Sequence, residues 1–379
     1  MKSQQIHYVT NNWKNAYSSP GFENDLCQLV LIFGESCSIT DPTLFAHIKK
    51  TYPNADLIFS STSGEIIGDS VHENSVVVTA IQFEKTRVAC RETNIRNHKN
   101  SHETGKYLME NLDGDKLESI FIISDGTHIN GSELVTGINE NNKNNIPVTG
   151  GLAGDGARFI KTFAGLNRVP EEGMVIAIGF YGSNLSVGHG SFGGWDEFGP
   201  TRKITKSNKN VLYEIDGKNA LELYKEYLGP YKDELPGSAL LFPLSIIEPS
   251  ADMSLVRTIL NINEDDKSMT FAGNMPEGSK LRLMKANFDK LIEGSSTAAN
   301  NSFNRNNKIP DLAILISCIG RKLILQERTD EEVQAAKDIF GDHTCITGFY
   351  SYGEISPFNN NSRCELHNQT MTITTFTES

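Results

Sequence analysis

The sequence contains Ile58-Phe-Ser-Ser-Thr-Ser-Gly-Glu-Ile-Ile-Gly68 near its start and a related stretch, Thr347-Gly-Phe-Tyr-Ser-Tyr-Gly-Glu-Ile-Ser-Pro357, near its end. An apolar run and a helix-like segment precede each copy, at residues 29–35 and 44–51 for the first and at residues 313–321 and 329–340 for the second. A third unit with the same plan covers residues 119–155 and ends in Gly150-Gly-Leu-Ala-Gly-Asp155. Three units of strand, helix, strand and glycine turn predict a duplicated architecture in which the glycine turns face one shared site.

Length and pattern predict an α/β protein with two lobes and mixed sheets, built from repeated strand-helix-strand-glycine-turn units. At 379 residues the chain exceeds the size that one hydrophobic core serves. We expect a polar lead-in at residues 1–26, a first domain at 27–222 and a second at 223–379, with the boundary at an amphipathic helix that follows Asp216. Further strands are expected at the short apolar runs 75–83, 159–164, 173–181, 185–190, 238–243, 256–260 and 280–284, and a further helix at 101–112.

Composition argues against nucleic acid and membrane as partners. The chain has 35 basic and 47 acidic residues, a net charge of −12, which opposes nonspecific binding to polyanions. The N-terminus has no apolar signal region, and no run reaches the roughly 18 apolar residues of a membrane span. The six cysteines form no Cys-x-x-Cys pair, which argues against structural zinc and covalent haem. We expect a cytoplasmic protein with reduced cysteines.

The common catalytic motifs are missing from the sequence. It has no phosphate-binding loop, no His-Glu-x-x-His and no Gly-x-Ser-x-Gly, so we expect no enzyme. Gly188-His-Gly-Ser-Phe-Gly193 matches Gly-x-Gly-x-x-Gly, but the residues that follow do not resemble the helix that dinucleotide binding requires. We interpret these glycines as turn formers.

Carboxylates recur beside glycine at the ends of predicted strands, where open α/β sheets gather ligands. They are Asp125, Asp155, Glu65 and Glu354. Such side chains could bind a ligand, or they could cap turns and helix starts. Arg321, at the end of a predicted strand, could pair with Glu354 or bind an anion through two nitrogens. A structural ion pair is equally compatible with its position.

Two further residues have competing interpretations. Cys318 ends an apolar run, where a thiol more often packs than reacts. His189 lies between two glycines after an apolar run, which would leave its imidazole accessible to a metal or a haem iron. We rank it ahead of His367 and His128 as an iron ligand; the alternative is an ordinary turn residue.

Taken together, these residues resemble the FIST family, a sensory module made of a FIST N and a FIST C portion. The matching pieces follow the family's order along nearly the whole chain. They are Ser61-Thr-Ser-Gly-Glu-Ile66, Ser124-Asp-Gly126, Gly150-Gly-Leu-Ala-Gly-Asp155, Asp216-Gly-Lys-Asn-Ala220 with Tyr224, Ser317-Cys-Ile-Gly-Arg321, Gly348-Phe-Tyr-Ser-Tyr-Gly-Glu-Ile355 and Leu366-His-Asn-Gln-Thr370. One stretch departs from the family, because residues 294–310 are richer in Asn and Ser than the expected helix.

The resemblance implies an intracellular sensor of a small ligand that signals to a protein such as a histidine kinase or a cyclic-di-GMP enzyme. A subgroup of stand-alone members binds haem, senses nitric oxide and controls a kinase. Haem b with nitric oxide is therefore the favoured ligand. An amino acid or another small polar metabolite is one alternative, held by Arg321, Glu354 and turn backbone groups. An enzyme that uses Asp155 and Glu354, with or without Cys318, and a scaffold without a ligand are the others.

We expect the glycine turns to line a pocket at or near the lobe junction. The predicted ligand-binding residues are Arg321, Glu354, Tyr352, Ser351, Cys318, Asp155, Gly151 and Glu65. The C-terminal copy has Tyr350 and Tyr352 near Arg321, whereas the N-terminal copy has Ser61 and Thr62. The ligand chemistry is therefore expected mainly at the C-terminal copy.

Overall fold

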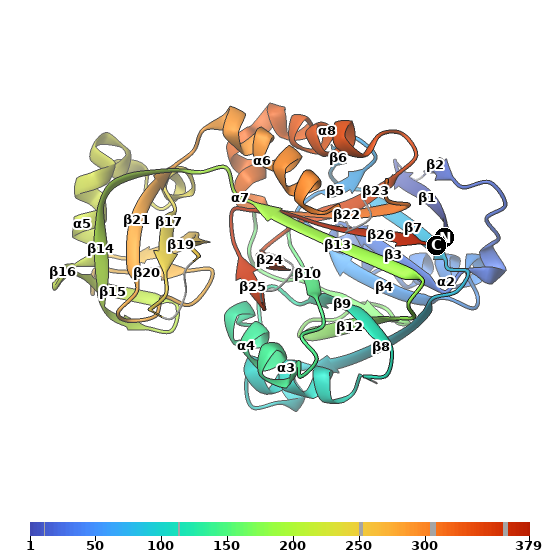
Figure 1. Cartoon of the computed structure of the whole chain (residues 1–379). Coiled ribbons are helices and arrows are strands. Elements are labelled where there is room, and N and C mark those ends of the chain that lie inside the picture. Colours follow the sequence, from blue (N-terminus) through green and yellow to red (C-terminus); the bar gives the residue numbers. More distant parts are fainter. Residues whose placement is uncertain (11, 113, 250–252, 304–307, 359–362) are drawn as a thin grey trace.

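The computed structural model describes residues 1–379 except 11, 113, 250–252, 304–307 and 359–362, and it has two bodies joined side by side (Figure 1). The smaller body runs from β14 (Asp196–Asn208) to β21 (Lys280–Lys285). The larger body contains the rest of the chain and holds both termini next to each other, where the Met1 ammonium lies 3.2 Å from Glu378. The two-lobed mixed α/β prediction is confirmed.

The described strands of the larger body form three sheets, and each sheet contains four central strands in the same arrangement. In the first unit the core strands are β1 (Lys2–Val9), β3 (Leu29–Gly34), β4 (Asp56–Ser61) and β7 (Val76–Gln82). In the second they are β8 (Arg87–Asn94), β9 (Leu117–Ser124), β10 (Val148–Leu152) and β12 (Met174–Tyr181). In the third they are β13 (Leu185–Phe192), β22 (Leu312–Cys318), β23 (Cys345–Ser351) and β26 (Met371–Glu378). Numbered by their order in the chain, the four strands lie in the order third, second, fourth, first in every sheet, and only the third and second are parallel.

The strand after each glycine turn leaves its own unit and joins the sheet of another. β5 (Glu65–Ile67) pairs with β23, β24 (Gly353–Pro357) pairs with β10, and β11 (Ala164–Leu166) pairs with β4. The first unit gives β5 and its neighbour β6 (Ser70–His72), the third gives β24 and its neighbour β25 (Cys364–His367), and the second gives β11. Each unit thus gives strands to one other unit, and the three exchanges close a ring. The repeat that the sequence indicates is therefore an approximate threefold arrangement rather than a simple duplication.

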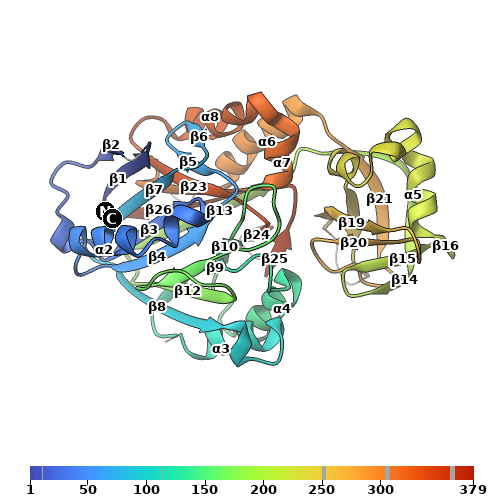
Figure 2. The ribbon, with the colours of Figure 1, turned by 180° about the vertical axis from the view of Figure 1, so that it is seen from behind.

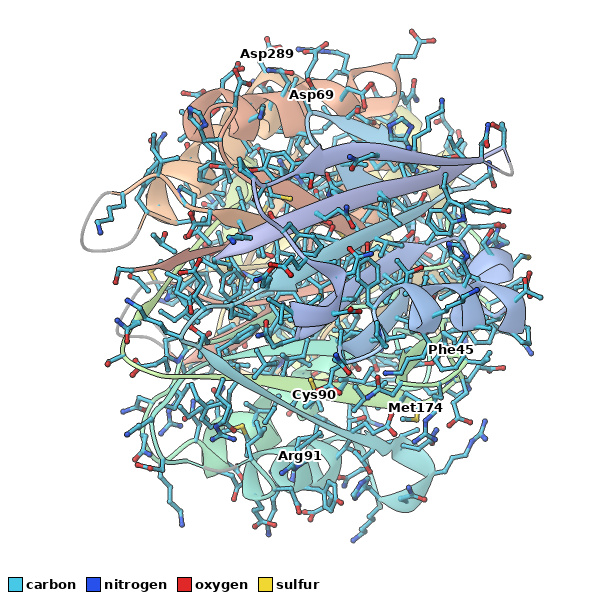
Figure 3. All side chains as sticks on the ribbon, turned by 90° about the vertical axis from the view of Figure 1, so that its right-hand side faces the viewer. Phe45, Asp69, Cys90, Arg91, Met174 and Asp289 are labelled. Atoms are coloured by element: carbon cyan, nitrogen blue, oxygen red, sulfur yellow. The ribbon has the colours of Figure 1, made fainter. Side chains whose placement is uncertain are left out.

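Helices cover the outside of this arrangement. α2 (Pro42–Thr51) begins where the Asp41 side chain accepts a hydrogen bond from the Thr43 N–H, and it packs on the first sheet through Leu44 and Ile48 (Figure 2). The other outer helices are α3 (Ser101–Glu110), α4 (Gly131–Asn141), α6 (Phe288–Asn301) and α8 (Thr329–Phe340). Seen from the end that carries the termini, these helices lie at the periphery with the sheets between them (Figure 3). In the described part of the chain, none of the helices has the length and hydropathy to cross a bilayer.

The centre of the larger body is one apolar core to which all three sheets contribute. Leu31 of β3, Phe121 of β9 and Ile314 of β22 are buried together there. Parallel strands that are covered on both faces have near-continuous apolar sequences, which is why these three runs were recognisable.

The smaller body has a core of its own. Its strands β14, β15 (Val211–Ile215), β17 (Leu244–Ile247), β18 (Leu255–Arg257), β19 (Ile259–Asn263), β20 (Ser268–Phe271) and β21 form a curled sheet. The helix α5 (Ala220–Leu228) packs into it through Leu221 and Tyr224. The sequence-based boundary at residue 222 thus falls within the smaller body, which is inserted between β13 and α6 of the third unit.

Two of the expected strands are wrong, and two regions whose conformation the sequence left open are now described. Residues 238–243 do not form a strand, because Gly237–Leu241 is a 3-10 helix (η4). Residues 159–163 do not form a strand either, and Phe159 and Ile160 are exposed. The lead-in at residues 1–26 is mainly the strands β1 and β2 (Asn12–Ser18). The polar stretch from residue 294 continues α6 to Asn301, and its residues 304–307 lie outside the described residues.

The glycines at 188–193 do not form a turn, because residues 188–192 belong to β13. Their role is to let α6 approach that strand closely. A Cβ atom on Gly190 would lie 2.1 Å from the carbonyl oxygen of Ala298. Only glycine fits this contact without moving the helix.

Candidate functional site

The three glycine turns meet at one place. The Ser63 N–H donates to the Tyr350 carbonyl over 2.8 Å, the Tyr352 N–H donates to that of Leu152 over 3.2 Å, and the Gly154 N–H donates to that of Ser61 over 2.9 Å. Each bond joins the turn of one unit to the turn or strand end of another. The exchange of strands explains this ring, because each chain segment must cross to another sheet directly after its turn.

Glu65 and Glu354 occupy equivalent positions in the two copies of the repeated phrase. Glu354 accepts from the Ser351 hydroxyl (2.8 Å) and from the Thr370 N–H (3.3 Å). Glu65 accepts from the Thr62 and Ser75 hydroxyls in the same way. Burial raises the pKa of Glu65 to about 7 and that of Glu354 to about 8. Both carboxyl groups are held inside their turns, which favours the turn-capping interpretation.

Asp155 shapes the loop that follows the glycine turn of the second unit, at residues 150–155. Its carboxylate accepts from the Ser36 hydroxyl (3.1 Å), from Arg158 Nε (2.9 Å) and from the Lys161 N–H (3.3 Å). Burial opposes its ionisation, but the bonds from Arg158 and Lys161 outweigh burial and hold the pKa of Asp155 below its usual value. It therefore stays ionised and organises residues 155–161.

Arg321 does not pair with Glu354, which was one of the possibilities that the sequence left open; it forms a structural ion pair instead. It lies in α7 (Ile319–Leu325), is fully buried, and forms its ion pair with Glu332. Its remaining donors bind the carbonyl oxygens of Gly193 and Leu291, among others. A guanidinium fixed in this way joins α7 to α8, β13 and α6, which is a structural role.

A cavity of about 260 Å³ lies between the two bodies, and we call it the junction cavity. The larger body contributes Phe159, Cys318, Ile319, Gly320, Tyr352 and Asn368 to its wall. The smaller body contributes Pro236, Gly237, Leu240, Thr258, Ile259, Leu260 and Ala272. Of the predicted ligand residues, Cys318 and Tyr352 line it. The lining does not include Ser351, Glu354 or Gly151. These three contact one another instead: Ser351 donates to Glu354, and Gly151 pairs with Glu354 in the sheet.

Two residues in the wall of the junction cavity each have a buried side-chain atom without a hydrogen-bond partner among the described residues. Asn368 is fully buried and Thr258 is 4% exposed. Neither Asn368 Oδ1 nor Thr258 Oγ1 has a hydrogen-bond partner among the described residues. A buried polar atom left without a partner costs about 1–3 kcal/mol, so each of these two atoms lowers stability at the cavity wall. In the sequence, Asn368 stands out only as part of the motif Leu366–Thr370, and no motif marks Thr258.

One wall of the junction cavity is a stacked aromatic pair. The rings of Phe159 and Tyr352 lie 4.5 Å apart with an angle of 17° between their planes. The Tyr352 hydroxyl donates to the Gly156 carbonyl and accepts from the Phe159 N–H, at 3.1 and 3.0 Å. Burial raises the pKa of Tyr352 to about 12, so the hydroxyl stays neutral. Cys318 is buried as well, and burial raises the pKa of its thiol, which makes it a poor nucleophile.

A second, more polar cavity of about 590 Å³ lies at the first copy of the phrase. Glu65, Arg158 and Lys322 are part of its wall, and Ile319 borders both cavities. Lys322 Nζ donates to the Ser63 carbonyl over 2.7 Å and pairs with Glu73. The mixed charges here are mostly satisfied by one another.

His189 is not accessible as predicted. It lies within β13 with only 6% of its surface exposed, and burial lowers its pKa to about 4. Its Nδ1 atom has no partner among the residues that the structure covers. His367 contacts the Ser356 carbonyl, and His128 lies beside Asp125. Within the described residues, no group of three or more His, Cys, Asp and Glu side chains could hold a metal ion.

Comparison with known proteins gives two family matches and one relative. The model described as the FIST N domain matches residues 28–218, and the model described as the FIST C domain matches residues 220–357. An uncharacterised protein of Methanocaldococcus jannaschii is 23% identical over 363 residues. That alignment covers 82% of this chain and 66% of the relative, so the chain spans somewhat less than two thirds of the relative's length.

Proposed function

Because the chain belongs to the FIST family, whose domains act as sensors in signal transduction, we propose that it binds a small molecule in the junction cavity and reports this binding to a partner protein. One observation carries the proposal. The cavity, about 260 Å³ in volume, is lined by residues of both bodies, so a molecule inside it contacts both at once.

A ligand in this place can change how the bodies sit together. Outside the cavity, the bodies meet through apolar packing of Leu240 and Leu241 against a cluster that includes Leu325, and through polar contacts. Arg257 Nη1 donates to the Leu366 carbonyl (2.9 Å), and Lys209 pairs with Glu133 (2.8 Å). A molecule that contacts both walls favours the arrangement in which those contacts are best, and this difference in affinity is the signal.

The partner in this proposal is a signalling protein such as a histidine kinase or a cyclic-di-GMP enzyme. The chain would bind it in the cytoplasm. A net charge of −12 favours a partner with a basic surface. All six cysteines are free, which agrees with a reducing compartment.

Haem b with nitric oxide is the ligand that the family resemblance favours, with His189 as the iron ligand. The surroundings of His189 do not fit haem, because the residue is buried within a sheet strand and lines neither the junction cavity nor the polar cavity at the first copy of the phrase. We therefore propose no step through iron. A Soret band that shifts with nitric oxide and is lost in His189→Ala would restore haem as the ligand.

Two of the three remaining alternatives, a charged metabolite and an enzyme, have less support. A charged metabolite such as an amino acid would need the Arg321 guanidinium, whose nitrogens are already bonded to Glu332 and to backbone carbonyls. Catalysis by Asp155 and Glu354 would need carboxylates that face the same space, and neither lines the junction cavity.

The proposal is tested by filling the cavity. Ala272→Leu adds bulk to the wall, and exposed Leu26→Ala is the matched control away from it. Small-molecule fractions of a cell extract should raise the melting temperature of the wild type and of the control, because a ligand at 100 times its Kd stabilises the folded state by about 2.7 kcal/mol. The rise should vanish in Ala272→Leu. An equal rise in all three proteins would place the ligand elsewhere.

A further inference from the structure

The side chains that line the junction cavity are mostly apolar. Leu240, Ile259 and Leu260 belong to the smaller body, and Phe159 and Ile319 belong to the larger one. Apolar surface is unfavourable in water, so a molecule that covers these side chains gains affinity from their burial alone.

Within the described residues, the polar side chains of this wall offer a ligand no open hydrogen-bond partner. Asn368 is fully buried, and Thr258 Oγ1 has almost no accessible surface. The Tyr352 hydroxyl already donates one hydrogen bond and accepts another, and Cys318 is buried. A ligand rich in polar groups would lose its hydrogen bonds to water here and would not replace them with side-chain partners.

The Arg257 guanidinium, buried next to Thr258 in the chain, is the charge that a ligand must tolerate. Burial lowers the pKa of Arg257 to about 10, so it stays charged at neutral pH. It donates to the carbonyls of Leu366 and Asn274, at 2.9 and 3.2 Å, and it is not part of the cavity wall. A cation in the cavity would be repelled by it, and an anion would lose its hydration without receiving these hydrogen bonds.

Apolar surface from both bodies also remains in water beside the cavity. Phe159 of the larger body is 43% exposed and Leu260 of the smaller body is 45% exposed, although both line the cavity. Ile160, next to Phe159 in the chain, is 65% exposed. Exposed apolar groups that adjoin one cavity favour an apolar occupant that contacts them together.

The volume of the cavity limits the size of this occupant. An apolar cavity of about 150 Å³ in a protein binds benzene. At about 260 Å³, the junction cavity has room for a molecule of roughly ten non-hydrogen atoms.

We infer that the junction cavity takes an uncharged, mainly apolar molecule of this size, held by burial between the apolar side chains of the two bodies. The inference rests on the proposed function, which places the ligand in this cavity. It separates the ligand from amino acids, phosphates and carboxylates by charge, and from sugars by polarity.

Four related probes test the inference by titration calorimetry of the whole chain. Butylbenzene is apolar, 4-phenylbutan-1-ol adds a hydroxyl, 4-phenylbutyrate adds a negative charge, and 4-phenylbutylammonium adds a positive charge. Butylbenzene should bind about tenfold or more tightly than 4-phenylbutyrate, about 1.4 kcal/mol. The alcohol should bind no more tightly than butylbenzene, and the cation should bind most weakly because of Arg257.

Two matched variants connect the binding to the cavity. Leu260→Ala should weaken butylbenzene binding several-fold, because it removes apolar contact area from the wall. Leu26→Ala, at a similarly exposed leucine away from the cavity, should not change it. Both leucines are partly in water, so both variants should fold.

Each contrary outcome has a defined meaning. If 4-phenylbutyrate binds as tightly as butylbenzene, Arg257 makes the cavity an anion site and the inference is overturned. Tighter binding of the alcohol would overturn it too, by revealing a polar partner. If no probe binds but an extract fraction stabilises the wild type and not Ala272→Leu, the ligand class is wrong and the sensor proposal stands. If neither probes nor extract act through the cavity, both proposals fail.

Discussion

At the scale of single residues, the most consequential group is a carboxyl that stays protonated. Glu354 is fully buried and its pKa is raised to about 8, whereas a glutamate in the unfolded chain titrates near pH 4.3. Between these values the folded protein holds a proton that the unfolded chain releases. The stability that this proton supplies is complete at low pH and is lost as the pH rises toward 8.

Glu354→Gln should therefore become more stable relative to the wild type as the pH rises. Glutamine resembles the neutral acid and cannot ionise. One pKa unit corresponds to about 1.4 kcal/mol, so the difference in unfolding free energy should grow by roughly 1 kcal/mol or more between pH 5 and pH 8. Urea unfolding at several pH values measures it, with exposed Glu226→Gln as the control. A difference that does not change with pH would show that Glu354 is ionised in the folded state.

At the scale of elements, close packing of α6 on β13 depends on glycine. Gly190→Ala would place a Cβ 2.1 Å from the Ala298 carbonyl oxygen and push the helix outward. We expect a loss of about 1–3 kcal/mol, as for other overpacked contacts. Gly237→Ala, where nothing lies within 4 Å, should cost far less. Denaturant midpoints of the two variants make the comparison, and similar values would contradict it.

The same elements show what sequence could and could not predict. The apolar runs at β3, β9 and β22 and the amphipathic α8 were identified because burial on both faces, or on one, leaves a clear pattern. β13 was placed correctly, but its glycines were misinterpreted as a turn because the reason for them, α6, begins about a hundred residues later. The 3-10 helix η4 looked like a strand because a short apolar run does not determine its conformation.

The candidate site shows the same limit. Cys318 and Tyr352 were predicted at the C-terminal copy and line the junction cavity. Thr258 was missed because it comes from the inserted body, which the repeat does not include. Their shared position at strand ends made Glu354 one possible partner of Arg321. The actual partner, Glu332, lies in α8, and only the packing of α7 on α8 brings the two side chains together.

At the scale of the whole molecule, the smaller body should be removable. Gly194 lies against Lys290, where a Cβ would be 2.2 Å from the Lys290 carbonyl oxygen, so the two ends of the insertion are close together. Replacing residues 196–285 with a short glycine–serine linker should leave a larger body that unfolds cooperatively, because its central core includes none of those residues. Circular dichroism during urea unfolding tests this. The shortened protein should also lose any stabilisation by the ligand, and an unfolded product would show that the bodies depend on each other.

The ring of exchanged strands also governs how the chain can be made. β5, at residues 65–67, pairs with the neighbouring β6, but on its other edge it pairs with β23, at residues 345–351. β26 lies in the middle of its sheet although it is the last described strand. During synthesis on a ribosome, the first unit must therefore wait, with the edge of β4 uncovered, until later units emerge. Contacts this distant in sequence slow folding and leave open edges exposed to aggregation. We therefore expect the larger body to reach its folded state only late in synthesis, after β23 has emerged.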